Sequence, residues 1–157
     1  MSVSVLFVCL GNICRSPTAD GIFRHQLEQA GLSKRIRVDS AGTGGWHIGR
    51  GPDSRTVTAA RKRGYDLSSL RARQVSVADF DEFDFILAMD SANLKDLHSL
   101  APAHFQGHLG LFLEFSRQYR EREVPDPYYG EGDGFERVLD LVEDASSGLL
   151  LHIQQRL

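Results

Sequence analysis

The chain has 157 residues, of which 41% are hydrophobic and 25% are charged, and its formal net charge is −3. These values are typical of a globular protein, and we expect residues 1–157 to form a single domain. The net negative charge gives no reason to expect a nucleic-acid partner, which usually requires a basic face. Basic residues do gather in mid-chain, and we interpret them as a solvated helix face: Arg55, Arg61, Lys62, Arg63, Arg71 and Arg73.

The sequence contains only two cysteines, Cys9 and Cys14. Two cysteines this close cannot form a disulfide framework, and no second pair exists to complete a zinc site. The apolar stretch at residues 3–10 has no basic segment before it, and it is too short for a signal peptide or a membrane span. We therefore expect a cytoplasmic, reducing compartment and no membrane partner.

Short apolar runs alternate with amphipathic stretches along the chain. The runs predict strands at 3–9, 35–40, 83–89 and roughly 107–113, and the amphipathic stretches predict helices at 16–30, 53–64, 91–99 and 135–157. Continuous apolar runs are typical of strands that are covered on both faces. We therefore predict an α/β fold with a parallel sheet, in which ligands bind beyond the carboxyl ends of the strands.

The turn after the first predicted strand reads VCLGNICRSP at residues 8–17, with Cys9 and Arg15 in a Cys-x5-Arg spacing. The first N–H groups of the following helix point back toward this loop. Gly11 and Asn12 tolerate the positive φ angles that a concave nest of amides needs, and Arg15 offers a planar fork for two phosphate oxygens. The turn therefore predicts an oxyanion-binding loop.

Cys9 lies at the floor of this predicted loop. A helix N-terminus and a nearby arginine favour the thiolate over the thiol, and the hydroxyl of Ser16 is placed to donate to the sulfur. A thiolate below a bound phosphate is positioned to attack phosphorus in line. The sequence has no GxxxxGKS motif, so hydrolysis of a nucleotide by a P-loop enzyme is not supported.

A proton donor for the leaving group is expected in VPDPYYGEGDG at residues 124–134. Pro125 and Pro127 restrict the backbone on both sides of Asp126, so that its carboxyl group is aimed reproducibly. Asp126 is therefore a candidate general acid, and Tyr128 and Tyr129 could form the walls of a slot for a flat ring. Taken alone, the segment is equally well explained as a proline-rich turn with two surface tyrosines.

Three motifs together resemble the low-molecular-weight protein tyrosine phosphatase family: CLGNICRSPTAD near the N-terminus, DSAGTGGWHIG at 39–49 and PDPYYG near the C-terminus. The resemblance extends over essentially the whole chain and includes the AMD at 88–90. It implies a three-layer sandwich in which a four-stranded parallel sheet is flanked by helices. It also implies a substrate protein that carries phosphotyrosine, no metal and no cofactor.

The family pattern implies a role for each matching residue. Cys9 matches the nucleophile, Arg15 the phosphate clamp and Asp126 the general acid. Asn12 matches the residue that holds the loop in its strained conformation, while Ser16 matches the donor to the thiolate and Ser40 a supporting hydroxyl bonded to that asparagine. The remaining matches bind the phosphate or surround the ring of the substrate: Leu10, Gly11, Ile13, Cys14, Trp46, Tyr128 and Tyr129.

The sequence departs from the family at one point. The family often has a histidine near position 69 that joins the hydrogen bonds of the loop, whereas this chain reads YDLSSLRARQV. We expect His47 and the other histidines to be structural or exposed. Cys14 has two open interpretations, which are a small buried residue at the start of the helix and a redox partner that protects Cys9 by a reversible disulfide.

Other function classes are less consistent with the sequence. Arsenate reductases of this fold need a further cysteine pair in mid-chain, and no cysteine follows Cys14. Protein arginine phosphatases usually have threonine in place of Ile13 and a smaller pocket in place of the tyrosine pair. A phosphate-binding module without catalysis would have lost Cys9, Arg15 or Asp126, and all three are present. We expect a monomer, and a transient dimer that buries the tyrosines stays open.

Overall fold

The computed structural model describes residues 2–128 and 133–157, and its strands form one parallel sheet in the order β2-β1-β3-β4. The strands are β1 (Val3–Cys9), β2 (Ile36–Gly42), β3 (Phe85–Ala88) and β4 (His108–Leu111). The helices are α1 (Arg15–Gln29), α2 (Ser54–Lys62), α3 (Asp79–Glu82), α4 (Ser91–Leu100), the 3-10 helix η1 (Phe112–Phe115) and α5 (Gly134–Gln154).

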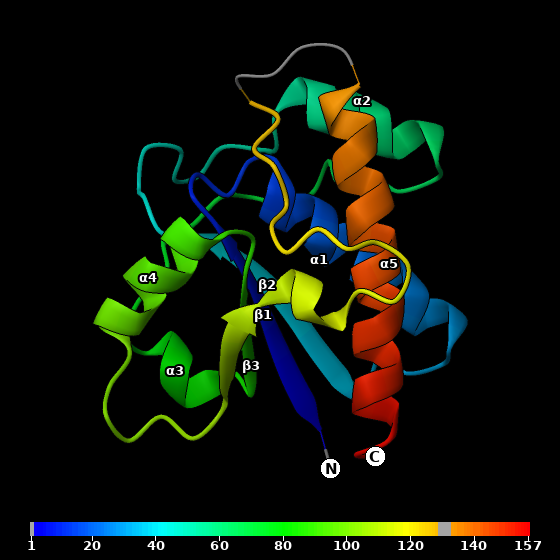
Figure 1. Ribbon diagram of the computed structural model, residues 1–157. Helices are drawn as coiled ribbons and strands as arrows, with labels where there is room; N and C mark the ends of the chain where they lie inside the picture. The colour runs from blue at the N-terminus through cyan, green and yellow to red at the C-terminus, as the bar shows by residue number, and fades with distance from the viewer. Residues whose placement is uncertain (1, 129–132) are drawn as a thin grey trace.

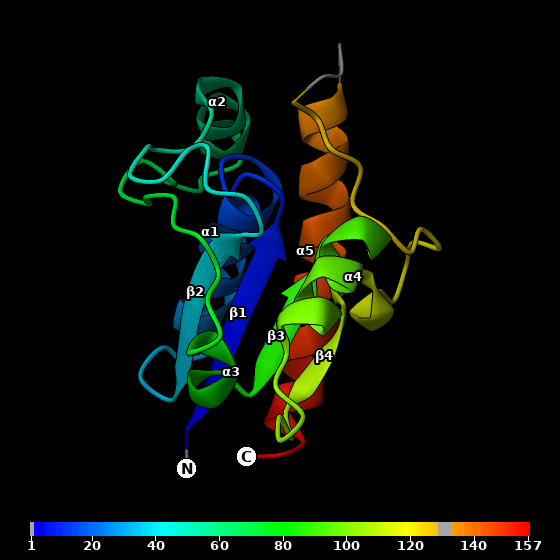
Figure 2. The same ribbon diagram turned by 90° about the vertical axis from the view of Figure 1, so that its left-hand side faces the viewer.

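The sheet is covered on both faces (Figures 1 and 2). Alternate residues of β1 point to opposite sides, so that Val5 and Phe7 join the core beneath α1 and α5, while Leu6 and Val8 join a second core with residues of α3 and α4. Each of these four side chains is fully buried. The continuous apolar run of β1 is thereby explained, and the predicted three-layer α/β sandwich is confirmed.

The structure also shifts some predicted boundaries and adds a short helix. The fourth strand ends at Leu111 rather than residue 113, because the chain turns there into η1 and buries Phe112 against Phe7. The short helix α3 was not predicted, since four residues are too few to show a helical period. The first helix begins at Arg15, one residue before the predicted start.

Candidate active site

The loop between β1 and α1 lies at the carboxyl edge of the sheet, where β1 ends at Cys9 and α1 begins at Arg15. Asn12 has a φ of 58° and is the one non-glycine residue with positive φ in the described part of the chain. Gly42 of the neighbouring strand lets the loop approach closely, because a Cβ there would lie 2.8 Å from the carbonyl oxygen of Leu10. The loop is therefore a strained turn that is packed against β2.

Two polar groups surround the sulfur of Cys9. The hydroxyl of Ser16 lies 3.0 Å from Sγ, and the backbone N–H of Asn12 donates to Sγ over 3.3 Å. Both groups favour negative charge on sulfur, as does the N-terminus of α1 directly below the loop. The expected contact between Ser16 and Cys9 is thus present.

The side chain of Asn12 connects the loop to its supports. Its Nδ2 donates to Oγ of Ser16 over 2.8 Å and to Oγ of Ser40 over 3.1 Å. Its Oδ1 accepts from the backbone N–H of Arg73 over 3.0 Å. The segment without the expected histidine therefore still supports the loop, through a backbone group, and the buried amide of Asn12 holds the αL conformation.

Arg15 is 3% exposed and is held by groups from distant segments. Its Nη1 donates to Oδ2 of Asp90 over 2.6 Å and to the carbonyl of Val124 over 3.0 Å, and its Nη2 lies 3.6 Å from Oδ2 of Asp126. Burial works against the charged guanidinium, but the negative groups at Cys9, Asp90 and Asp126 outweigh it and raise the pKa of Arg15. Arg15 is therefore a charged, buried donor beside Cys9.

Asp90 is a site residue whose role the sequence analysis did not identify. Its Oδ2 binds Arg15, while its Oδ1 accepts from the backbone N–H of Asn93 and caps the N-terminus of α4. The available signal was a carboxylate two residues after the buried strand β3, at the same sheet edge as Cys9. Its partner could be identified only from the tertiary structure.

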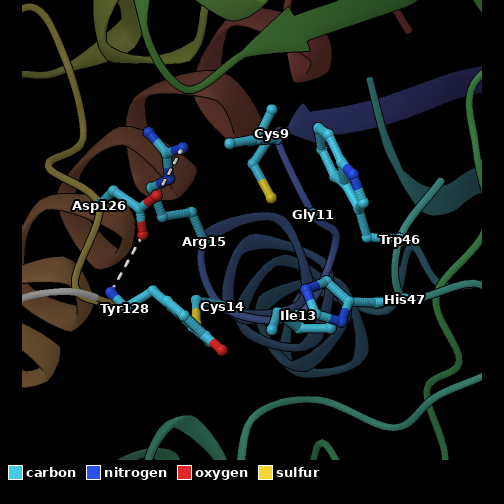
Figure 3. A pocket seen from close by; sticks show the side chains of 10 residues that line it. Cys9, Gly11, Ile13, Cys14, Arg15, Trp46, His47, Asp126 and Tyr128 are labelled. Carbon is cyan, nitrogen blue, oxygen red and sulfur yellow. Dashed lines mark hydrogen bonds and ion pairs between the residues drawn. The ribbon is translucent and has the colours of Figure 1, made fainter. Parts of the chain in front are cut away.

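Asp126 reaches the site because its segment is anchored to the end of β3. The backbone N–H of Val124 donates to the carbonyl of Met89 over 2.8 Å. The carboxyl group of Asp126 accepts from the N–H of Tyr128 at Oδ1 over 3.0 Å, which leaves Oδ2 facing Arg15 (Figure 3). The pocket thus contains a carboxyl group that faces the guanidinium of Arg15.

These residues surround a pocket of about 500 Å³. Figure 3 shows Trp46 and Tyr128 on opposite sides of the space in front of the Cys9 sulfur. The pocket is lined by Cys9, Leu10, Gly11, Ile13, Cys14, Arg15, Trp46, His47, Asp126 and Tyr128. The expected pocket residues therefore lie together, except that Tyr129 falls outside the described residues. The two aromatic walls and the apolar lining suit a flat ring.

His47, which we expected to be structural or exposed, is half-buried, and its ring lines this pocket. It packs over Gly11, where an added Cβ would lie 3.0 Å from its Cδ2. Its centroid is 6.4 Å from that of the Tyr128 ring. The histidine therefore forms part of the rim opposite Tyr128, and its place next to Trp46 in the sequence was the available signal.

Cys14 is buried beside Ile13 and Ala72, with 4% of its surface exposed. Burial is the main cause that raises the pKa of its thiol to about 12, and the negative charge of Asp53 adds to it. Cys14 is therefore a neutral thiol at physiological pH. Its position agrees with the packing role, and a disulfide with Cys9 stays a prediction.

A model of the family described as low molecular weight phosphotyrosine protein phosphatase matches residues 4–157 of the chain. The chain belongs to this family. Among its relatives is a Synechocystis protein assigned to the low molecular weight protein-tyrosine-phosphatases, 47% identical over 156 residues that cover 99% of each chain. The suspected resemblance is thus confirmed.

Two solved phosphatases of the family have the same fold. The crystal structure of a Bacillus subtilis protein matches with a TM-score of 0.93 and 44% identity, and it covers 99% of this chain and 97% of its own. A protein tyrosine phosphatase from Entamoeba histolytica, with Hepes in its active site, matches with a TM-score of 0.94 and 39% identity over 98% of both chains. The arrangement of strands and loops described above is thus that of the family.

No group of three or more His, Cys, Asp or Glu side chains within 2–128 and 133–157 is arranged to hold a metal ion. No helix in that same part of the chain is long and apolar enough to cross a membrane.

Proposed function

We propose that this chain is a protein tyrosine phosphatase that hydrolyses phosphotyrosine through a cysteinyl-phosphate intermediate. The observation that carries the proposal is that Cys9, Arg15 and Asp126 line one pocket with aromatic walls, although Asp126 comes from the other end of the chain. Relatives from Schizosaccharomyces pombe and Bacillus subtilis are named as phosphatases of this family, which supports the same activity. In this proposal residues 1–157 act as a single domain.

In the first step, the Cys9 thiolate attacks phosphorus and the bond from phosphorus to the tyrosine oxygen breaks. Asp126 donates a proton to the leaving oxygen, which would otherwise depart as a phenolate. The guanidinium of Arg15 and the loop amides bind the phosphate oxygens as charge builds on them. Asp90 and Val124 hold Nη1 of Arg15. Its Nη2 lies 3.6 Å from the carboxyl group of Asp126, beyond hydrogen-bond distance, so Nη2 can donate to the phosphate.

In the second step, water attacks phosphorus and the bond between sulfur and phosphorus breaks. Asp126, now a carboxylate, accepts a proton from that water, and inorganic phosphate leaves with Cys9 restored as a thiolate. Ser16 and the N–H of Asn12 stabilise the returning charge on sulfur. Ile13, Trp46 and Tyr128 favour an aryl phosphate over a smaller or more polar group.

The substrate in this proposal is a phosphotyrosine-bearing segment of another protein, and the enzyme acts as a monomer. A reducing compartment such as the cytoplasm fits the reaction, because the nucleophile must stay a free thiolate. Both cysteines are free in the structure.

The proposal is tested by hydrolysis of p-nitrophenyl phosphate and of a phosphotyrosine peptide, in reducing buffer with a chelator. The wild type is compared with Cys9→Ser and Asp126→Ala. We expect turnover by the wild type and none by Cys9→Ser. In Asp126→Ala we expect kcat/KM for the phosphotyrosine peptide to fall by about 10² to 10⁴, with a smaller fall for p-nitrophenyl phosphate. Full activity of Cys9→Ser would overturn the proposal, and a wild type that hydrolyses phosphoarginine alone would replace the substrate class.

A further inference from the structure

The residue pair Asp53 and Arg55 lies between the Cys9 loop and the segment that carries Asp126. Asp53 is attached to the loop, because its backbone N–H donates to the carbonyl of Ile13 over 2.8 Å. Its carboxylate also accepts from the backbone N–H of Arg55 over 2.9 Å and so caps α2. Asp53 is therefore fixed on two sides, at the loop and at the start of a helix.

Arg55 forms a fork with the Asp53 carboxylate. Its Nε donates to Oδ1 over 3.0 Å, and its Nη2 donates to Oδ2 over 3.0 Å. The hydrogen bonding from the Arg55 side chain is the largest cause that lowers the pKa of Asp53, so the carboxylate stays charged. A bidentate pair fixes the plane of the guanidinium, which a single contact cannot do.

The fixed guanidinium contacts the acid segment and the start of α5. Nη2 of Arg55 donates to the carbonyl of Tyr128 over 3.2 Å, and Cζ lies 5.4 Å from the centroid of the Tyr128 ring. On its other side Cζ lies 4.9 Å from the ring centroid of Phe135, the second residue of α5. Arg55 therefore touches the chain on both sides of residues 129–132.

Tyr128 links this contact to the carboxyl group of Asp126. Its N–H donates to Oδ1 of Asp126, and its carbonyl accepts from Arg55. The backbone N–H of Tyr128 thus contacts Asp126, and its carbonyl contacts Arg55. A movement of the Tyr128 backbone would turn the carboxyl group that faces Arg15.

We propose that Arg55, fixed by Asp53, is a positioning residue for proton transfer by Asp126. The inference rests on the proposed function. The side chain of Arg55 is 47% exposed, and exposed ion pairs contribute little to the stability of a fold. The pair therefore acts mainly on the position of the acid segment relative to the Cys9 loop. Lysine cannot replace the fork, because its single ammonium group cannot hold the plane.

The dependence of the rate on the leaving group tests this role. A general acid matters most when the leaving oxygen is basic, as in phenyl phosphate and a phosphotyrosine peptide, and less for p-nitrophenyl phosphate. We expect Arg55→Gln and Arg55→Lys to lower kcat/KM for the first two substrates about tenfold. For p-nitrophenyl phosphate we expect a loss of about twofold or less. kcat/KM is the right quantity, since it covers the steps up to cleavage of the phosphate ester.

A double variant separates positioning from a general effect on the fold. In the Asp126→Ala background, Arg55→Gln should cause no further loss, because the group that it positions is gone. Arg61→Gln is the matched control, since Arg61 is exposed on the same helix and lies in its last turn. We expect Arg61→Gln to behave like the wild type with every substrate.

Two results would overturn the inference while the proposed function stands. One is an equal loss of kcat/KM for all three substrates in Arg55→Gln. The other is a loss by Arg55→Gln that persists in full when Asp126 is already alanine. If instead Cys9→Ser retains activity, the proposed function itself fails, so the two failures are distinguishable. Thermal unfolding of each variant shows whether a loss comes from an unfolded protein.

Discussion

Replacement of Asp90 should weaken both the fold and the chemistry. Asp90 is 23% exposed and forms an ion pair of 2.6 Å with Arg15, which is 3% exposed. At an effective dielectric constant of 20, Coulomb's law gives a gross attraction of about 6 kcal/mol at this distance. The desolvation of both groups offsets much of this attraction, but removal of one partner leaves the other charge buried, which costs about 3–5 kcal/mol in fully buried pairs.

The expected cost for Asp90→Asn lies below that range. Arg15 keeps its bond to the carbonyl of Val124, and asparagine still accepts a hydrogen bond from the guanidinium. We expect Asp90→Asn to lower the free energy of unfolding by about 2 kcal/mol. Asp90→Ala should lose about 1 kcal/mol more, since alanine also removes the cap of α4, which asparagine preserves.

Urea unfolding of the wild type and the two variants measures these values, provided that the m-value stays the same. A loss of about 2 kcal/mol corresponds to a fall in Tm of roughly 4–8 °C for a chain of this size. kcat/KM for p-nitrophenyl phosphate should fall in both variants, because the guanidinium of Arg15 is no longer fixed. The reasoning is refuted if Asp90→Asn unfolds within about 0.5 kcal/mol of the wild type, or if Asp90→Asn and Asp90→Ala cost the same.

Three further changes have definite expected results. Gly42→Ala should lower kcat at least tenfold without unfolding the protein, because the new Cβ meets the carbonyl oxygen of Leu10 at 2.8 Å and displaces the loop. An activity assay measures the loss of kcat, and circular dichroism shows that the variant is folded. Iodoacetamide at about pH 7 should modify Cys9 and leave Cys14 unmodified, since burial raises the pKa of the Cys14 thiol to about 12. Peptide mass mapping identifies the modified cysteine, and modification of Cys14 before Cys9 would contradict the prediction. Burial raises the pKa of Asp20 above its ordinary value of 3.8. The folded state therefore binds this proton more tightly than the unfolded state, and the free energy of unfolding falls as pH rises from 3.8 toward the raised pKa. Asp20→Asn should therefore reduce the loss of unfolding free energy as pH rises above 3.8, and an unchanged pH profile would count against this assignment.

The fold was predictable from the sequence because its strands are buried on both faces. The run at 3–9 has no polar face, and that pattern suits a central strand of a parallel sheet. The boundaries of α3 and η1 were not predictable, since each has only four residues and its position is set by packing. Phe112 illustrates this, because contact with Phe7 in the core decides where β4 stops.

The site was predictable where its residues are local in sequence. Cys9, Asn12 and Ser16 lie within one turn, so their contacts follow from the geometry of a strand that enters a helix. The contacts of Asp90 and Arg55 were not predictable, because each depends on two segments that meet only in the folded chain. A charge beside an apolar strand or on a helix face is usually solvated, and the sequence pattern does not reveal the exception.

The most direct test of the account is to trap the intermediate. Asp126→Ala is mixed with radiolabelled p-nitrophenyl phosphate, whose leaving group depends little on a general acid. The mixture is quenched rapidly in acid and digested, and the labelled peptide is identified. The variant still offers the thiolate but lacks the base of the second step, so the cysteinyl phosphate should accumulate. The account predicts label on the peptide that contains Cys9, and its loss in a Cys9→Ser control. Phosphate release without labelled enzyme, or label on another residue, would contradict it.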